Sequence, residues 1–96
     1  MPGNHRRLDA FQLADQMAVL VYRHTDRFPA SERYGLRSQM RRAAVSTRTI
    51  IVEGCSREGE ADYLRFLDIA LGSAKELVHL AGLATRLSLL DAARSR

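Results

Sequence analysis

Apolar residues recur with a helical period along almost the whole chain, and only two segments interrupt that period. Pro29 lies in the first interruption, and Gly54 and Gly59 mark the second. Elsewhere the spacing is near 3.6 residues and never alternates in the two-residue manner of a strand. At 96 residues the chain is one domain at most. The sequence therefore predicts an all-α fold, an up-down antiparallel helical bundle with three long helices plus a short or missing fourth.

The boundaries of these helices follow from residues that start and stop helices. Asp9 is a candidate N-cap for the first helix, and the backbone before Pro29 cannot stay helical. Ser31 is the expected N-cap of the second helix, Gly54 its expected left-handed C-terminal residue, and Gly59 the expected N-cap of the third. The predicted helices and tail span residues 8–25, 32–53, 60–86 and 88–96.

The apolar positions of each predicted helix define the face that we expect in the core. The face of the first helix comprises Leu13, Met17, Leu20, Val21 and His24. The face of the second comprises Leu36, Met40, Ala43, Ala44, Thr47, Ile50 and Ile51. The face of the third comprises Tyr63, Leu64, Leu67, Ala70, Leu71, Ala74, Leu77, Val78, Ala81 and Ala84. We also expect Tyr34, Tyr63 and Phe66 in the core, and close helix packing at Gly72, since a glycine within a helix otherwise costs about 1 kcal/mol relative to alanine.

The third helix carries a second, narrower apolar stripe, roughly 120° around the helix from the first. Its members are Ile69, Leu80, Leu83 and Leu87. A helix with two apolar stripes needs two neighbours to bury them. We interpret the second stripe as an oligomer interface, and the alternative is burial within the chain against the first helix and the tail.

The number and positions of the arginines give the strongest indication of a binding surface. The net charge is +4, and fourteen of the fifteen basic residues are arginine. A GC-rich genome would also favour arginine codons, but it would not determine where the arginines lie. Arg33, Arg37, Arg41 and Arg48 fall within about 80° of one another on the second predicted helix.

Guanidinium groups bind phosphate bidentately, so this stripe is typical of a surface that holds a nucleic-acid backbone without reading its sequence. We predict RNA or DNA binding through the stripe and Arg42, with Arg6 and Arg7 widening it if the fold brings them near. The alternative is a solvated helix face, with Glu32, Glu53 or Asp68 as partners. No zinc-finger spacing or RNA-reading aromatic motif is present, so binding would be electrostatic and salt-dependent.

The chain offers no constellation for catalysis or metal binding. His5, His24 and His79 are too scattered to form a metal pair, and Cys55 has no second cysteine. Ser46, Ser73 and Cys55 lack a local histidine base with an orienting acid, and no glycine-rich phosphate loop is present. We therefore expect no catalytic residues, no metal, no cofactor and no small-molecule substrate, and we predict that the protein is not an enzyme.

The expected location is the cytoplasm. A single cysteine fits a reducing compartment, no secretory leader is recognisable, and no apolar stretch is long enough to cross a membrane.

Five blocks of sequence, in order, resemble a known family. The blocks are Phe28–Pro29, Glu32–Leu36, Gln39–Ser46, Glu53–Gly54 and Tyr63–Leu77. They are similar to the bacterial four-helix-bundle family of 23S rRNA intervening-sequence proteins, and also to the accessory variability proteins of diversity-generating retroelements. The resemblance covers about residues 8–90.

The resemblance implies a left-handed antiparallel four-helix bundle that assembles into a ring, typically a homopentamer, with a basic surface that engages nucleic acid and with no established catalytic activity. Two departures modify this expectation. The family's Ile-Pro-x-Asn-Ile-Ala stretch appears here as Thr47–Val52, and the loss of the proline predicts a straighter second helix. The family's long fourth helix is missing, which predicts a subunit with a vacant groove.

These observations favour a non-enzymatic, homo-oligomeric helical bundle associated with nucleic acid. The alternative is a purely structural or protein-interaction accessory module that ignores nucleic acid, and a third possibility is a truncated gene product with little function.

Overall fold

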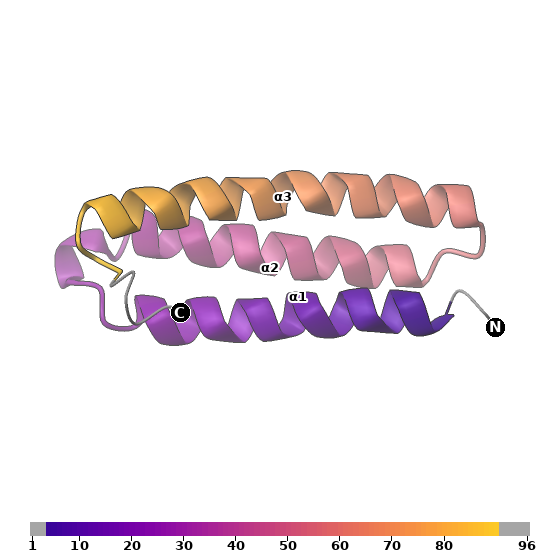
Figure 1. The fold of residues 1–96 in the computed structure, drawn as a ribbon, viewed down its shortest axis with the longest axis horizontal. Helices are drawn as coiled ribbons and strands as arrows, with labels where there is room; N and C mark the ends of the chain where they lie inside the picture. Colours follow the sequence, from indigo (N-terminus) through magenta and orange to yellow (C-terminus); the bar gives the residue numbers. More distant parts are fainter. Residues whose placement is uncertain (1–3, 91–96) are drawn as a thin grey trace.

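The computed structural model describes residues 4–90, and in this range the only regular elements are helices. They are α1 (Asn4–Thr25), the short 3-10 helix η1 (Ala30–Glu32), α2 (Leu36–Cys55) and α3 (Glu60–Arg86). The three long helices run alternately up and down in a bundle of 45 × 23 × 17 Å (Figure 1). This arrangement confirms the predicted all-α, up-down fold, and α2 is continuous where the family's proline would lie.

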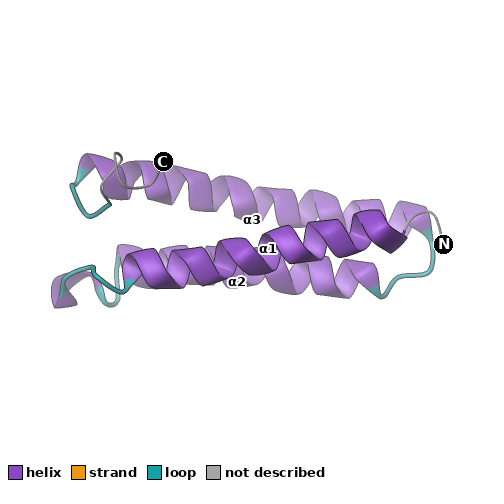
Figure 2. Cartoon of the chain, turned by 60° about the horizontal axis from the view of Figure 1, so that its bottom comes forward, coloured by secondary structure: helices purple, strands orange, loops and turns teal. Residues whose placement is uncertain are grey.

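The central helix of the bundle is α2, because it packs along both other helices. Among the described residues, no Cα atom of α1 lies within 8 Å of a Cα atom of α3. Figure 1 shows α1 and α3 on two different sides of α2, and Figure 2 shows α1 in front of α2 with α3 above them. Each outer helix is therefore held mainly through α2.

Small residues on α2 permit this two-sided packing. Ala43 and Ala44 are buried, and so is Gly54 near the C-terminal end of the helix. The other buried residues of α2 are Leu36, Met40, Thr47 and Ile51. The predicted core face of the second helix is confirmed, with Ile50 partly buried at its edge.

The predicted core face of the first helix is only partly right, because Met17 and Val21 pack against the core but His24 is exposed. The buried residues of α1 are Ala14, Ala18 and Thr25, whereas Leu13 is 67% exposed and Leu20 is also exposed. Alanine allows the closest approach to α2, and Thr25 is held there by a hydrogen bond from Arg41. Polar contacts and small side chains therefore set the rotation of α1.

Only part of the predicted wide stripe of the third helix is buried. Tyr63, Ala70, Leu77 and Ala84 are buried as predicted, and so is Phe66, which was expected in the core as an aromatic residue. Leu64, Leu71 and Val78 lie on the same helix but are exposed, because no helix covers that side of α3.

An open groove follows from the separation of α1 and α3. It has a volume of about 460 Å³ and is lined by Thr47 and Ile51 from α2 and by Leu64, Leu67, Asp68, Ala70, Leu71 and Ala74 from α3. This feature agrees with the vacant groove that the sequence predicted.

The start of α2 differs from the prediction. Ser31 lies in η1 and does not cap α2, which begins at Leu36 rather than near residue 32. The carboxylate of Glu32 accepts a hydrogen bond of 3.0 Å from the backbone N–H of Leu36. Glu32 therefore supplies the acceptor expected from Ser31. Likewise, α1 begins at Asn4, so Asp9 lies inside the helix and is not its N-cap.

The packing of α2 against α3 requires glycine at position 54, whereas no packing contact requires glycine at position 72. Gly54 lies within α2 and has no positive φ, so the predicted left-handed C-terminal role is wrong. A Cβ atom at Gly54 would lie 2.9 Å from the Cβ atom of Phe66. At Gly72 a Cβ atom would meet nothing within 4 Å, so the expected close packing there is also wrong. Gly59 is the N-cap of α3, as predicted.

The C-terminal end of α3 turns back onto the core. Ser88 adopts a φ of 63°, and its N–H donates to the carbonyl of Thr85 while the N–H of Leu89 donates to the carbonyl of Ala84. This is the Schellman pattern of helix termination. Leu89 and Leu90, in the predicted tail, pack against the core. The remainder of the tail, 91–96, lies outside the described residues.

We predict opposite effects for alanine at two glycines. Gly54→Ala should lower the free energy of unfolding by about 1–3 kcal/mol, because the added methyl group overlaps Phe66 across the α2–α3 contact. Gly72→Ala should raise it by about 0.5–1 kcal/mol, because alanine is the better helix former and meets no neighbour. Urea denaturation followed by circular dichroism measures both, and a stabilised Gly54→Ala variant would contradict the α2–α3 packing.

Candidate nucleic-acid interface

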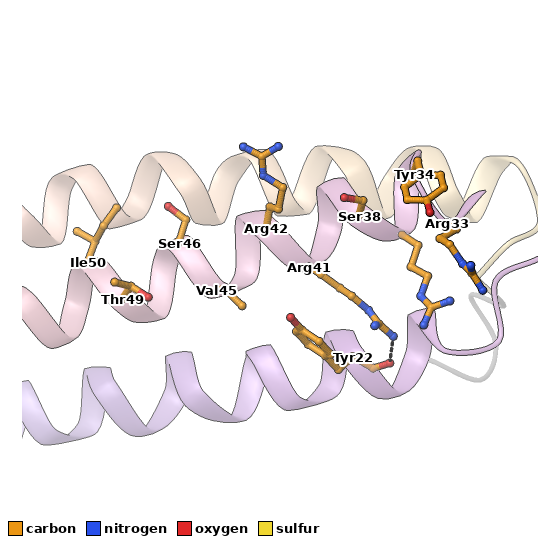
Figure 3. A pocket seen from close by; sticks show the side chains of 11 residues that line it. Tyr22, Arg33, Tyr34, Ser38, Arg41, Arg42, Val45, Ser46, Thr49 and Ile50 are labelled. Carbon is orange, nitrogen blue, oxygen red and sulfur yellow. Dashed lines mark hydrogen bonds between the residues drawn. The ribbon is translucent and has the colours of Figure 1, made fainter. Parts of the chain in front are cut away.

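A basic cleft runs along the side of α2 that faces away from the core. It has a volume of about 810 Å³ and begins where α2 begins (Figure 3). Four of the five predicted nucleic-acid-binding residues line it, namely Arg33, Arg37, Arg41 and Arg42. The remaining lining residues are Tyr22, Tyr34, Ser38, Val45, Ser46, Thr49 and Ile50, so no acidic residue of the described range 4–90 lines the cleft.

The predicted stripe is not a single row on one helix. Arg33 lies in the turn between η1 and α2, so it reaches the cleft from the turn rather than from a helix. Arg48 lies outside the cleft, on the edge of α2 that faces α1. The prediction treated residues 32–53 as one helix, and the turn at residues 33–35 breaks that register.

Arg41 connects α2 to the end of α1. Its Nε donates to the buried hydroxyl of Thr25 at 2.9 Å, and its Nη2 donates to the carbonyl of Tyr22 at 3.1 Å (Figure 3). Its guanidinium also lies 4.4 Å from the centroid of the Tyr22 ring. Charged hydrogen bonds of this kind contribute more than neutral ones, so Arg41 stabilises the α1–α2 contact.

Asp26 lies between two arginines. The distances from its Oδ1 are 3.6 Å to Nη2 of Arg37 and 3.7 Å to Nη2 of Arg41. The carboxylate is largely exposed, so each ion pair is weak. One carboxylate beside two guanidinium groups also leaves this part of the cleft positive.

Arg48 forms a second link between α1 and α2. Its Nε donates to Oδ1 of Asp15 at 2.7 Å, and its guanidinium lies 5.1 Å from the centroid of the Phe11 ring. The partners of the paired arginines are thus Asp15 and Asp26, rather than Glu32, Glu53 or Asp68 as the solvated-face alternative supposed.

Arg33 and Arg42 differ from the other three. Both are exposed, and neither forms an ion pair or a side-chain hydrogen bond with another residue in the range 4–90. These two guanidinium groups therefore keep their full capacity for an external anion.

Arg6 and Arg7 do not widen the cleft. Arg7 lies in the first turns of α1, where it donates to the carbonyl of Arg57 and lies 3.4 Å from the carboxylate of Glu60. It also covers the ring of Tyr63 at 4.3 Å. These contacts place it at the α2–α3 connection, which is at the other end of the bundle from Arg33 (Figure 1).

The aromatic residues were only partly predicted. Tyr63 and Phe66 are buried, as expected, but Tyr34 is 87% exposed and lines the cleft. The prediction failed because Tyr34 was assigned to a helix, and the turn before α2 points it away from the core.

The predicted oligomer stripe of α3 is largely exposed. Ile69, Leu83 and Leu87 are exposed, whereas Leu80 is partly buried and packs against the core. Three of the four residues are therefore accessible to a second chain, and the fourth, Leu80, also contributes to the core of its own chain.

Two titratable side chains outside the cleft have raised pKa values. Burial raises the pKa of the Cys55 thiol, with Arg7 opposing the shift, and burial raises the pKa of Tyr63. A raised thiol pKa lowers the fraction of the nucleophilic thiolate. Within residues 4–90 no group of three or more metal-ligating side chains occurs, and none of the described helices is long and apolar enough to span a membrane.

The fold and the cleft together define a class, that of small all-helical bundle proteins with a basic surface. Within that class the family can be named. The family model for 23S rRNA-intervening sequence protein matches residues 6–96, so the chain belongs to this family. The match confirms the resemblance drawn from the sequence blocks. No curated protein matches the chain.

We predict that two neighbouring arginines contribute differently to stability. Arg41→Met should lower the free energy of unfolding by about 1–3 kcal/mol, because the contacts with Thr25 and Tyr22 are lost. Arg42→Met should change it by less than about 0.5 kcal/mol, since the side chain is exposed. The two variants carry the same charge, and their urea midpoints give the comparison. Equal midpoints would contradict a structural role for Arg41.

Proposed function

We propose that this protein is a non-enzymatic, homo-oligomeric helical bundle that binds the phosphate backbone of RNA or DNA in the basic cleft of α2, in the cytoplasm and without a cofactor. The observation that carries the proposal is that four arginines line one cleft whose lining contains no carboxylate. Membership of an rRNA-intervening sequence protein family supports a connection with nucleic acid.

The chemistry of the cleft suits phosphate groups in a row. Arg33 and Arg42 offer unpaired guanidinium groups, and Arg37 shares the single carboxylate of Asp26 with Arg41. The carboxylate of Glu32 already occupies the N-terminus of α2, so the positive charge offered to a ligand comes from the arginines. Contacts with about two to four phosphates per subunit would give a slope of log affinity against log salt near −2 to −4.

Oligomerisation is supported by two exposed apolar surfaces on different sides of α3. One contains Ile69, Leu83 and Leu87, and the other is the groove rim with Leu71 and Val78, the latter 69% exposed. Docking of the first surface of one copy into the groove of the next is a head-to-tail contact, and such contacts form a ring when the rotation from copy to copy closes. The family resemblance favours a pentamer. A ring repeats the cleft in every subunit, so its binding strength would exceed that of one copy.

A second candidate function is a structural accessory module that assembles with itself or another protein and ignores nucleic acid. The observation in its favour is that Arg37, Arg41 and Arg48 already have acceptors within the chain. The two candidates differ in whether Arg33 and Arg42 contribute to an affinity for nucleic acid.

We predict that Arg33→Gln/Arg42→Gln weakens binding of a labelled RNA hairpin at least about 10-fold at low salt, because two phosphate contacts are lost. The control is Lys75→Gln/Arg86→Gln, which removes the same charge from α3, outside the cleft lining. It should change the affinity by less than about 3-fold. Fluorescence anisotropy over a series of salt concentrations gives both the affinity and the salt slope.

Neither substitution in Arg33→Gln/Arg42→Gln touches a core contact, so the variant should keep the wild-type unfolding midpoint. Equal weakening by the two double substitutions would show that only net charge matters. An absence of binding by the wild-type protein at low salt would overturn the nucleic-acid half of the proposal and favour the structural module.

We predict an oligomer whose mass depends on both apolar surfaces. Light scattering should give a multiple of the 10.8 kDa chain for the wild-type protein. Leu83→Glu and Leu71→Glu, one on each surface, should each lower that mass, because a buried unpaired carboxylate is costly. Val19→Glu is the matched control, since Val19 is comparably exposed but lies on α1 away from the groove lining. A monomeric wild-type protein at high concentration would overturn the assembly.

A further inference from the structure

Tyr34 is the most exposed of the large apolar side chains on the described surface, at 87%. It stands at the end of the basic cleft where α2 begins, next to Arg33 (Figure 3). An aromatic ring that the fold leaves uncovered beside guanidinium groups is not explained by phosphate binding alone.

The other two tyrosines each have a guanidinium over the ring. The guanidinium of Arg7 lies 4.3 Å from the ring centroid of the buried Tyr63, and that of Arg41 lies 4.4 Å from the ring centroid of Tyr22, which lines the cleft and is 43% exposed. Tyr34 has no such partner among residues 4–90. It is therefore the most exposed of the three described tyrosines and the one whose ring no guanidinium occupies.

The turn that carries Tyr34 is held in place by hydrogen bonds. The backbone N–H of Arg33 donates to Ala30, that of Gly35 donates to Glu32, and the carboxylate of Glu32 accepts from the N–H of Leu36. Gly35 has a φ of −103° and a ψ of −121°, which turns the chain sharply into α2. Binding at Tyr34 would then cost little backbone entropy, because the backbone is already ordered.

An exposed aromatic ring beside arginines favours single-stranded over double-stranded nucleic acid as the ligand. A duplex presents its phosphates to a protein but keeps its bases stacked inside. An unpaired nucleotide presents a phosphate and also a flat base that stacks on an aromatic side chain. The cleft offers a partner for both groups.

We propose that Tyr34 stacks on an unpaired base of single-stranded nucleic acid while Arg33, Arg37 and Arg42 hold the adjacent phosphates. The inference rests on the proposed function, because it places the strand in the same basic cleft. It narrows the ligand from nucleic acid in general to single strands, loops or unpaired ends. The arginine contacts alone would not distinguish single-stranded from double-stranded ligands.

The experiment compares two probes on the full chain by fluorescence anisotropy. One is a short labelled RNA that cannot pair with itself, and the other is the same RNA annealed to its complement. Wild-type protein should bind the single strand more tightly. Tyr34→Ala should weaken single-strand binding roughly 5- to 100-fold and leave duplex binding within about 2-fold, whereas Tyr34→Phe should retain wild-type behaviour, because stacking needs the ring and not the hydroxyl.

A second readout is the intrinsic tyrosine fluorescence of the protein, which contains no tryptophan. The single strand should quench the emission of the wild-type protein, and most of the quenching should be lost in Tyr34→Phe, since Tyr63 is buried and Arg41 lies over the ring of Tyr22. Circular dichroism checks that Tyr34→Ala is folded, as expected for so exposed a residue.

The outcomes separate this inference from the function on which it rests. In one outcome both probes bind in a salt-sensitive way, and Tyr34→Ala leaves both affinities unchanged or weakens them equally. That result would overturn the stacking of Tyr34 but would still support nucleic-acid binding in the basic cleft. No binding of either probe at low salt would overturn both. If Tyr34→Ala lowers the oligomer mass without altering the affinity per subunit, Tyr34 is a protein contact and the inference fails.

Discussion

The packing of α2 against two helices at once is the constraint on which the rest of the structure depends. Ala43, Ala44 and Gly54 keep this helix thin enough to be approached from both sides. Because α1 and α3 are each held through α2, they do not close on one another. The open groove and the exposed leucines on its rims follow from that geometry.

The same arrangement divides the arginines into two groups with different roles. Arginines on the edge of α2 that faces α1 find acceptors there, as Arg41 does at Thr25 and Arg48 does at Asp15. Arg33, in the turn before α2, and Arg42, on its outer side, have no such acceptor among residues 4–90. Arginine therefore stabilises the contact between α1 and α2 at some positions and forms an exposed basic surface at others. The proposed binding site consists of the arginines that do not take part in helix packing.

Much of the fold could be predicted from the sequence, because helix periods and helix ends are local properties. The bounds of α3 and the buried face of α2 were predicted correctly. The rotation of α1 was predicted only in part, because it depends on hydrogen bonds that Arg41 and Arg48 donate from α2 to Thr25, Tyr22 and Asp15 of α1. The exposure of Tyr34 was missed for a related reason, since Glu32 and Gly35 form a turn where the periodicity predicted helix. The sequence therefore predicted which arginines form the candidate site, but it did not predict which of them have hydrogen-bond or ion-pair partners within the fold.

The division of the arginines is the central claim, and the side-chain Nε–H signals of arginine in a nuclear magnetic resonance titration test it most directly. In the protein alone, the Nε–H groups of Arg41 and Arg48 should exchange slowly with water, because each donates a hydrogen bond within the fold, while those of Arg33 and Arg42 should exchange rapidly. Addition of single-stranded RNA should slow and shift the signals of Arg33 and Arg42 and leave that of Arg48 in place. Rapid exchange of all four, or a shift of Arg48 alone, would contradict the account.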